Sequence, residues 1–183
     1  MAAANSGAGR PQKGRSAAGT TSPGDPPPPA RTPWRALWGE PPSASAWLAP
    51  FNAAVLVGGG LVAVAAGLAQ AGPVRPPPAS TLLAVVLLQP LLEELFFRGC
   101  LQGELLRRRA LRRRALGISG ANAATTIAFA GLHLLHNAPA HALLVAVPSL
   151  VYGHARERYR GVTIPALQHV VHNACLVMTF VIA

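Results

Sequence analysis

Two adjacent carboxylates, Glu93 and Glu94, stand inside a long apolar stretch of the sequence. They follow LLAVVLLQPLL and precede LFF, and the whole chain has only 6 acidic residues. An ionisable side chain is costly inside a bilayer, so one found in such a stretch is by default a functional-site hypothesis. Two neighbouring carboxylates cannot both be ionised cheaply in a low dielectric, so one of them needs a proton or a cationic partner.

Arg98 is the cationic partner that the spacing predicts. It follows Glu94 by four residues, which places both side chains on one face of a helix. Glu93 points about 100° away from Glu94, because successive residues of a helix are separated by that angle. One carboxylate is then structural, while the other is free for proton transfer. A Glu–Arg pair without any chemistry explains this segment equally well when the segment is taken by itself.

Two further segments carry polar groups suited to the same chemistry. His133 follows Phe129 in the pattern FAGLH, and His169 precedes Asn173 by four residues on one helix face. A single histidine in an apolar helix is usually a hydrogen-bonded core residue, but three polar segments that converge form a candidate site. A carboxylate and an imidazole can hold and deprotonate a water. A second histidine and an amide can donate hydrogen bonds to a developing oxyanion.

The remaining histidines match no pattern, and we expect them at helix ends or helix interfaces: His136, His141, His154 and His172. His136 and His172 each lie one helical turn from a candidate histidine. Cys100 and Cys175 fall in apolar segments and are expected to be small buried hydrophobic residues.

The composition indicates a membrane protein. Hydrophobic residues make up 51% of the chain and charged residues only 12%, whereas a soluble domain carries about 25% charged residues. The mean hydropathy is positive, at +0.34. No Lys, Arg, Asp or Glu occurs between Ala115 and Ala155. A soluble protein could hardly keep such a segment hydrated on one side.

The basic residues argue against a nucleic-acid partner, although the formal net charge is +10. Nucleic-acid binding would need these side chains on a folded soluble face. They gather instead in the N-terminal tail, at residues 107–114 and at residues 156–160, next to apolar runs. Cytoplasmic loops of membrane proteins have this pattern, so membrane lipids are the expected surroundings.

The fold class that follows is all-α: a polytopic bundle of about five transmembrane helices after a disordered tail. Residues 1–45 are rich in Ala, Gly, Ser and Pro, which predicts a disordered cytoplasmic segment. A transmembrane domain is predicted over residues 46–183. Its spans are expected at residues 46–71, 80–107, 118–136, 139–155 and 162–183. The glycine run at residues 58–60 would let a neighbouring helix approach the first span closely.

The charge distribution predicts the orientation. Fourteen of the 16 basic residues fall in the tail and the two basic loops, which five alternating spans place on one side of the membrane. This side should be the cytoplasm. The N-terminus is therefore predicted inside and the C-terminus outside, and the Ala-, Arg- and Pro-rich style of the chain suggests a bacterial inner membrane.

Three ordered motifs resemble those of the CAAX protease and bacteriocin-processing family of intramembrane endopeptidases, also called the abortive-infection family. The motifs are E-E-x-x-x-R at Glu93, Glu94 and Arg98, F-x-x-x-H at Phe129 and His133, and H-x-x-x-N at His169 and Asn173. The resemblance covers residues 80–183, which would form the protease core. The chain departs from the family in being short, with few helices before the first motif.

This resemblance implies a metal-independent, glutamic-type intramembrane endopeptidase that needs no cofactor. Glu93 would activate a water together with His133. His169 and Asn173 would stabilise the tetrahedral intermediate, while Arg98 would hold Glu94. The cleaved bond would lie near a membrane-embedded or lipid-proximal C-terminus or leader of a protein substrate. A prenylated C-terminus, a leader peptide and a C-terminal sorting tail are the candidates.

Two alternatives use the same residues. In the first, Glu93, His133 and His169 bind Zn²⁺, since three N or O ligands and a water satisfy zinc. No H-E-x-x-H motif occurs, and zinc would take the carboxylate that must accept the proton, so the metal-free mechanism is preferred. In the second, the cluster serves packing in a non-catalytic scaffold or immunity protein. The oligomeric state is left open.

Overall fold

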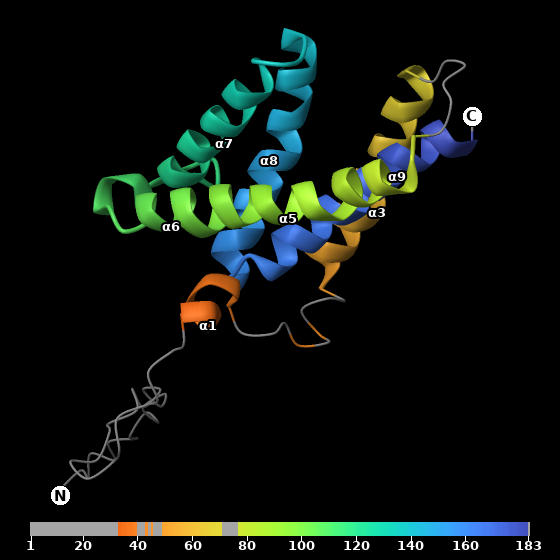
Figure 1. Ribbon diagram of the computed structural model, residues 1–183. Coiled ribbons are helices and arrows are strands. Elements are labelled where there is room, and N and C mark those ends of the chain that lie inside the picture. Colours follow the sequence, from red (N-terminus) through yellow and green to blue (C-terminus); the bar gives the residue numbers. More distant parts are fainter. Residues whose placement is uncertain (1–32, 40–42, 44, 46–48, 71–76, 183) are drawn as a thin grey trace, which may run out of the picture. The chain divides into compact units, whose positions relative to one another are not determined.

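The computed structural model describes residues 33–39, 43, 45, 49–70 and 77–182. The predicted disorder of residues 1–32 concerns residues outside this part. The described elements are α1 (Pro33–Trp38), α3 (Pro50–Gln70), α4 (Ala79–Leu83), η1 (Ala84–Leu88), α5 (Gln89–Glu94), η2 (Leu95–Leu101), α6 (Gln102–Leu105), η3 (Arg109–Arg112), β1 (Arg114–Ala115), β2 (Ile118–Ser119), α7 (Gly120–His133), α8 (Pro139–Tyr159) and α9 (Thr163–Ile182). Helices dominate this part of the chain, in agreement with the all-α prediction (Figure 1).

Helix α1 lies within the segment that composition predicted to be disordered, so that prediction is wrong for Pro33–Trp38. The Leu37 side chain packs against Gly99, where an added Cβ would stand 2.6 Å from Leu37 Cδ1. The Trp38 carbonyl accepts a hydrogen bond of 2.9 Å from Thr163 Oγ1. These contacts with later helices supply the burial that the local composition does not provide.

One continuous helix, Ala79–Leu105, carries the two carboxylates. Its segments η1 and η2 are π-helical, and they bracket the α-helical turn α5 that contains Glu93 and Glu94. A π turn holds more residues than an α turn, so it rotates the side chains that follow it, and it often occurs at functional sites. The Arg98 carbonyl in η2 accepts a hydrogen bond of 3.0 Å from Arg156 Nε of α8.

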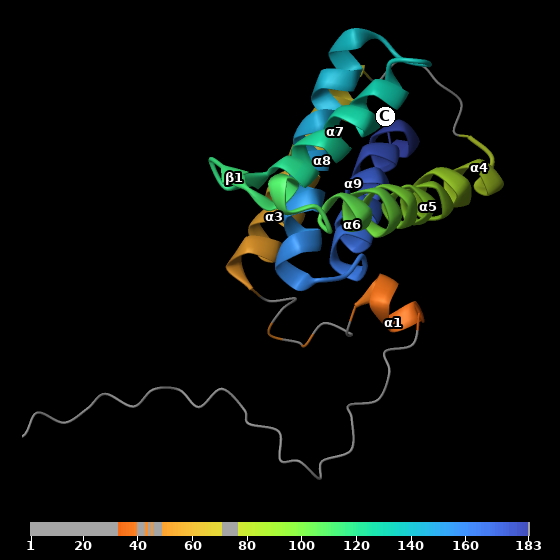
Figure 2. The ribbon, with the colours of Figure 1, turned by 90° about the vertical axis from the view of Figure 1, so that its left-hand side faces the viewer.

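Helices α7 and α8 form a hairpin that packs against this helix (Figures 1 and 2). The hydroxyl of Ser119 accepts a hydrogen bond of 3.0 Å from the backbone N–H of Asn122, and so caps the start of α7. Pro139 begins α8, where the missing N–H of proline has no helical partner to lose. The strands β1 and β2 make a short antiparallel hairpin before α7, with Arg114 opposite Ser119.

Helices α3 and α9 lie side by side and approach each other at glycines. A Cβ added to Gly59 would stand 2.2 Å from His172 Nε2, and one added to Gly67 would stand 1.9 Å from Thr179 Oγ1. A Cβ on Gly58 would meet nothing within 4 Å. The predicted close approach is therefore present at Gly59, Gly60 and Gly67, but not at Gly58.

Two helices of the described chain are long and apolar enough to cross a membrane, Pro50–Leu68 and Ala79–Leu105. The last three predicted spans correspond to α7, α8 and α9. Helix α7 has 14 residues, which cover only about 21 Å at 1.5 Å per residue. This length is short for a bilayer core of about 30 Å, so five complete spans remain a prediction.

Candidate active site

A cavity of about 460 Å³ lies among α3, α5, α7, α8 and α9. Its lining includes the four residues predicted to be catalytic: Glu93, His133, His169 and Asn173. They come from α5, α7 and α9, so tertiary packing brings together side chains that are up to 80 positions apart in the sequence. Glu94 and Arg98, predicted to be supporting residues, are fully buried and lie outside this lining.

The predicted ion pair between Glu94 and Arg98 is confirmed. Arg98 Nε lies 3.3 Å from Glu94 Oε2, and both side chains are 0% exposed. Arg98 Nη2 also donates hydrogen bonds of 3.0 Å to the carbonyl and hydroxyl oxygens of Ser149. The guanidinium carbon stands 5.1 Å from the ring centroid of Phe129 and 5.7 Å from that of Tyr152. A charge in this position joins α7 and α8 to the helix that carries the carboxylates.

His169 on α9 stands between both carboxylates. Its Nδ1 lies 3.0 Å from Glu94 Oε1, and its Nε2 lies 3.7 Å from Glu93 Oε2. An ionised carboxylate only accepts hydrogen bonds, so Nδ1 carries the proton that is donated to Glu94. The Nε2 atom is then the one on the Glu93 side. If His169 is an imidazolium, its charge and that of Arg98 balance the two carboxylates.

Glu93 has different surroundings from its neighbour in the sequence. Gln89, one turn earlier on the same helix, donates a hydrogen bond of 2.9 Å from Nε2 to Glu93 Oε1. The Glu93 side chain is 18% exposed, and it contributes to the cavity wall. Glu94 is enclosed by Arg98 and His169 instead. The two carboxylates therefore face different environments, as their separation of about 100° on the helix predicted.

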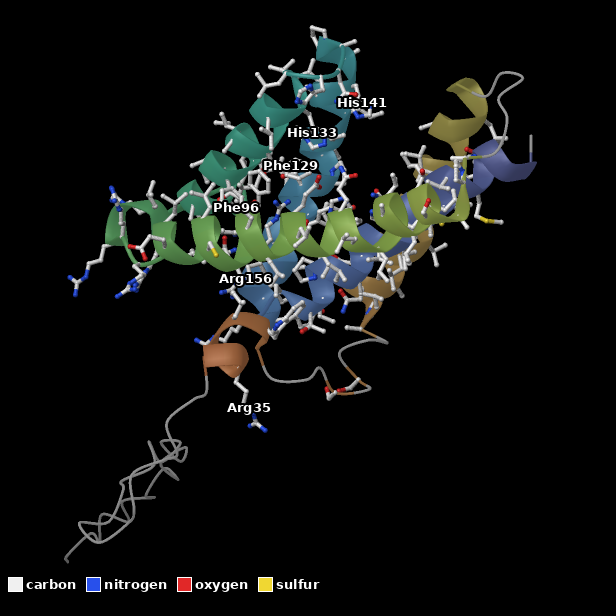
Figure 3. The ribbon with its side chains drawn as sticks, viewed as in Figure 1. Arg35, Phe96, Phe129, His133, His141 and Arg156 are labelled. Carbon is white, nitrogen blue, oxygen red and sulfur yellow. The ribbon has the colours of Figure 1, made fainter. Side chains whose placement is uncertain are left out.

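His133 is held at the end of α7. Its Nδ1 is 2.9 Å from the carbonyl oxygen of Phe129, and its ring lies 4.5 Å from the Phe129 ring. A carbonyl only accepts, so Nδ1 carries the proton and Nε2 of the neutral ring is an acceptor. Figure 3 shows His133 beside His141, and their ring centroids are 6.1 Å apart.

The histidine that contacts Glu93 directly is His169. The family resemblance implied that His133 shares a water with Glu93, and such an arrangement needs no direct contact between the two side chains. Within the described part of the chain, no hydrogen bond or ion pair joins His133 to Glu93, although both line the cavity. The His133 ring is hydrogen-bonded through Nδ1 to the Phe129 carbonyl of its own helix, which leaves Nε2 for a water. A water could still lie between the two side chains, which is the arrangement that the mechanism below requires.

Asn173 completes the polar wall on the α9 side. Its Nδ2 donates a hydrogen bond of 3.0 Å to the carbonyl oxygen of Val85, in the π-helical segment η1. An amide NH₂ has two hydrogens, so the second remains for a bound oxygen atom. The π turn thus provides the carbonyl that orients the asparagine.

Several residues of the site were not among those predicted to be functional. Tyr152 of α8 stacks on His169 with ring centroids 4.9 Å apart, and its hydroxyl lies 2.7 Å from His172 Nδ1. His172 lies at the interface of α9 with α3, and His141 lies in the first turn of α8, as expected, but both also contribute to the cavity wall. For His172 the spacing of three residues after His169 was an available signal, since it places both on one side of the helix. Tyr152 and Ser149 have no comparable spacing to a candidate residue on their own helix.

The alternative zinc ligands Glu93, His133 and His169 all line the cavity but do not form a three-ligand cluster in this arrangement. Among the described residues, no group of three His, Cys, Asp or Glu side chains is placed to hold a metal. Glu93 and His169 approach each other, but His133 is turned toward the Phe129 carbonyl.

These features define a helical membrane protein with a carboxylate–histidine centre at an internal cavity. A family model described as type II CAAX prenyl endopeptidase Rce1-like matches residues 75–175, just over half of the chain. The chain therefore belongs to the Rce1-like family. No curated protein and no solved structure matches it.

Family membership identifies the chain as a protease of the CAAX endopeptidase class with a protein substrate. The matched residues contain all three motifs of the sequence analysis, from Glu93 to Asn173. They exclude α1 and α3, although α3 contributes one wall of the cavity.

Proposed function

We propose that this chain is a glutamic-type intramembrane endopeptidase in which Glu93 is the general base. The observation that carries the proposal is the separation of the two adjacent carboxylates. Glu94 is enclosed in an ion pair with Arg98, whereas Glu93 faces the cavity that His133, His169 and Asn173 also line. Only Glu93 can reach a water and a substrate carbonyl there.

In the proposed reaction a water is held between Glu93 and Nε2 of His133. Glu93 takes one proton of this water as its oxygen attacks the carbonyl carbon of the scissile bond. The oxyanion that forms accepts hydrogen bonds from Nε2–H of a protonated His169 and from the free amide hydrogen of Asn173. Glu93 then gives its proton to the departing amine, the C–N bond breaks, and the carboxylate is regenerated.

Glu94 and Arg98 act on this reaction from behind the cavity wall. Glu94 accepts the Nδ1 hydrogen bond of His169, which directs Nε2 of that ring toward Glu93. Arg98 supplies the cation that pairs with Glu94 where both side chains are 0% exposed. The pair is therefore a support for His169 rather than a reactant.

The cavity wall suggests the kind of substrate segment that enters. Apart from the polar cluster, most of the lining is apolar and comes from α3 and α8, with Val62, Ala66 and Val147 among its residues. This wall suits an extended peptide with apolar side chains or a lipid-modified C-terminus. A prenylated C-terminus, a leader peptide and a C-terminal sorting tail on a membrane-associated protein all fit that description.

Glu93→Gln tests the mechanism. In purified protein, an internally quenched farnesylated peptide ending in a CAAX sequence reports cleavage, and thermal unfolding in detergent reports folding. Loss of a general base costs about 10²-fold or more in turnover, while the amide keeps the shape and the contact with Gln89, so stability should stay near wild type.

The matched control is Glu104→Gln, which alters an exposed glutamate on the same helix and should leave turnover unchanged. A folded Glu93→Gln that cleaves the peptide as fast as wild type would contradict the proposal. If wild type does not cleave this peptide, C-terminal peptides are compared between cells that carry wild type and cells that carry Glu93→Gln. Identical C-termini in that comparison support a scaffold without catalytic activity.

A further inference from the structure

A chain of three side chains connects α3 to the centre of the proposed active site. The carbonyl oxygen of Val55 on α3 lies 3.1 Å from His172 Nε2, and His172 Nδ1 lies 2.7 Å from the Tyr152 hydroxyl. The Tyr152 ring is only 2% exposed and stacks on His169 at an interplanar angle of 23°. Through Tyr152, the chain of contacts reaches His169, the histidine that contacts both carboxylates.

The direction of each hydrogen bond follows from the chemistry of its ends. A backbone carbonyl only accepts, so His172 Nε2 carries a proton and donates it to Val55. Nδ1 of the neutral ring is then an acceptor, and Tyr152 donates its hydroxyl proton to it. Both ends of the His172 ring are engaged, and the phenol ring of Tyr152 is held at its far end by a directed hydrogen bond.

Gly59 on α3 is required for this arrangement. The His172 ring occupies the space beside its Cα, because an added Cβ would lie 2.2 Å from Nε2 and 2.5 Å from Cε1. Any residue other than glycine at position 59 must displace the imidazole. Gly59 and Val55 precede the residues matched by the family, so this part of the support comes from outside the matched segment.

We propose that Tyr152, held by His172, is a positioning residue that fixes the ring plane of His169. This inference rests on the proposed role of His169 in stabilising the oxyanion. One hydrogen bond, from Nδ1 to Glu94, leaves the imidazole free to swing about that bond. The stacked phenol ring removes this freedom, so that Nε2 stays on the Glu93 side of the cavity. Neither Tyr152 nor His172 exchanges a proton with the substrate.

The first test displaces the support from another helix. Gly59→Ala should lower kcat about 10-fold or more with KM near wild type, because a shift of about 1 Å in a catalytic group costs on the order of 10²-fold. His172→Ala removes the ring that the new methyl group would strike. The double variant should therefore be no slower than His172→Ala alone.

Gly131→Ala is the matched control for a glycine replaced by alanine inside a helix, since a Cβ there meets nothing within 4 Å. A Gly59→Ala loss that persists in full in the His172→Ala background overturns the proposal, because the methyl group would then act on the substrate directly. Wild-type kcat in Gly59→Ala overturns it as well.

The second test removes the hydrogen bond between Tyr152 and His172 without changing α3. It tests the positioning role of Tyr152 even if Gly59→Ala does not fold. Tyr152→Phe keeps the aromatic stack but leaves the phenyl ring unanchored, so kcat should fall about 5-fold, the order expected for one hydrogen bond. Tyr152→Leu loses the stack too and should fall further, to about the level of the Gly59→Ala variant or below. Equal turnover for wild type, Tyr152→Phe and Tyr152→Leu contradicts the inference.

Failure of this inference can be told from failure of the proposed function. If Glu93→Gln is inactive while the Tyr152 and Gly59 variants keep wild-type kcat, the mechanism stands and the positioning role is wrong. If Glu93→Gln keeps full turnover, the mechanism itself is wrong. All variants are compared after their folded fraction has been measured by size-exclusion chromatography and thermal unfolding.

Discussion

Glu94→Gln is the substitution that best separates structural from catalytic carboxylates. Glutamine has the shape of glutamate and can still accept the hydrogen bond from His169 Nδ1 through its amide oxygen. It cannot neutralise Arg98, whose guanidinium is fully buried and, among the described residues, retains the Ser149 oxygens and the rings of Phe129 and Tyr152. The substitution therefore strands a positive charge in the protein interior.

The size of the effect follows from that burial. Removing one member of a buried ion pair costs about 3–5 kcal/mol, which for a domain of this size corresponds to a decrease in Tm of roughly 6–20 °C. Glu104 and Arg107 form a pair on the same helix at 3.5 Å, but their side chains are 63% and 79% exposed. Glu104→Gln should shift Tm by about 2 °C or less, because solvent screens such a pair.

The assay combines thermal unfolding in detergent with the yield of folded protein and turnover per folded molecule. We expect Glu94→Gln to lose folded protein first and activity as a consequence, whereas Glu93→Gln keeps its Tm and loses turnover. A stable, well-expressed Glu94→Gln without activity, beside a Glu93→Gln that still turns over, would show that the roles of the two carboxylates are reversed.

Two further predictions concern topology and metal. In a protein without its native Cys100 and Cys175, a cysteine at position 75 should react with a membrane-impermeant label from outside, and one at position 110 should not, because the basic residues place the 107–114 loop in the cytoplasm. Labelling at position 110 from outside would refute the five-span topology. Chelators should leave peptide cleavage intact after purification, because Glu93 and His133 suffice to activate water. The metal mechanism would be supported if the purified protein contained stoichiometric zinc, lost activity when the zinc was removed, and regained activity when zinc was added back.

Local spacing predicted those parts of the site that lie within one helix. The Glu94–Arg98 pair is four residues apart, and a helix brings such positions together without help from the rest of the chain. The common face of His169 and Asn173 has the same origin, and both line the cavity. The number and order of long helices likewise followed from uninterrupted apolar segments.

Contacts between different helices could not be predicted from the spacing of residues within one helix. The direct approach of His169 to Glu93 depends on how α9 is rotated against α5, which the spacing within one helix does not determine. The π-helical segments η1 and η2 add to the uncertainty, since they change the direction of side chains without a sequence pattern that marks them. The contact of Tyr152 with His169 depends on how α8 packs against α9, and the spacing of residues within one helix does not predict that packing.

The spacing of the Glu94–Arg98 pair also bears on how the chain is made. The helix Ala79–Leu105 leaves the ribosome before the later segments that contact it exist, and Ser149 and His169 are among their residues. A lone charge at the centre of an inserting helix costs roughly 2.5–3.5 kcal/mol. A pair within one turn can neutralise itself on the nascent helix, so the segment can enter the bilayer early and receive its remaining polar partners as each later helix is synthesised.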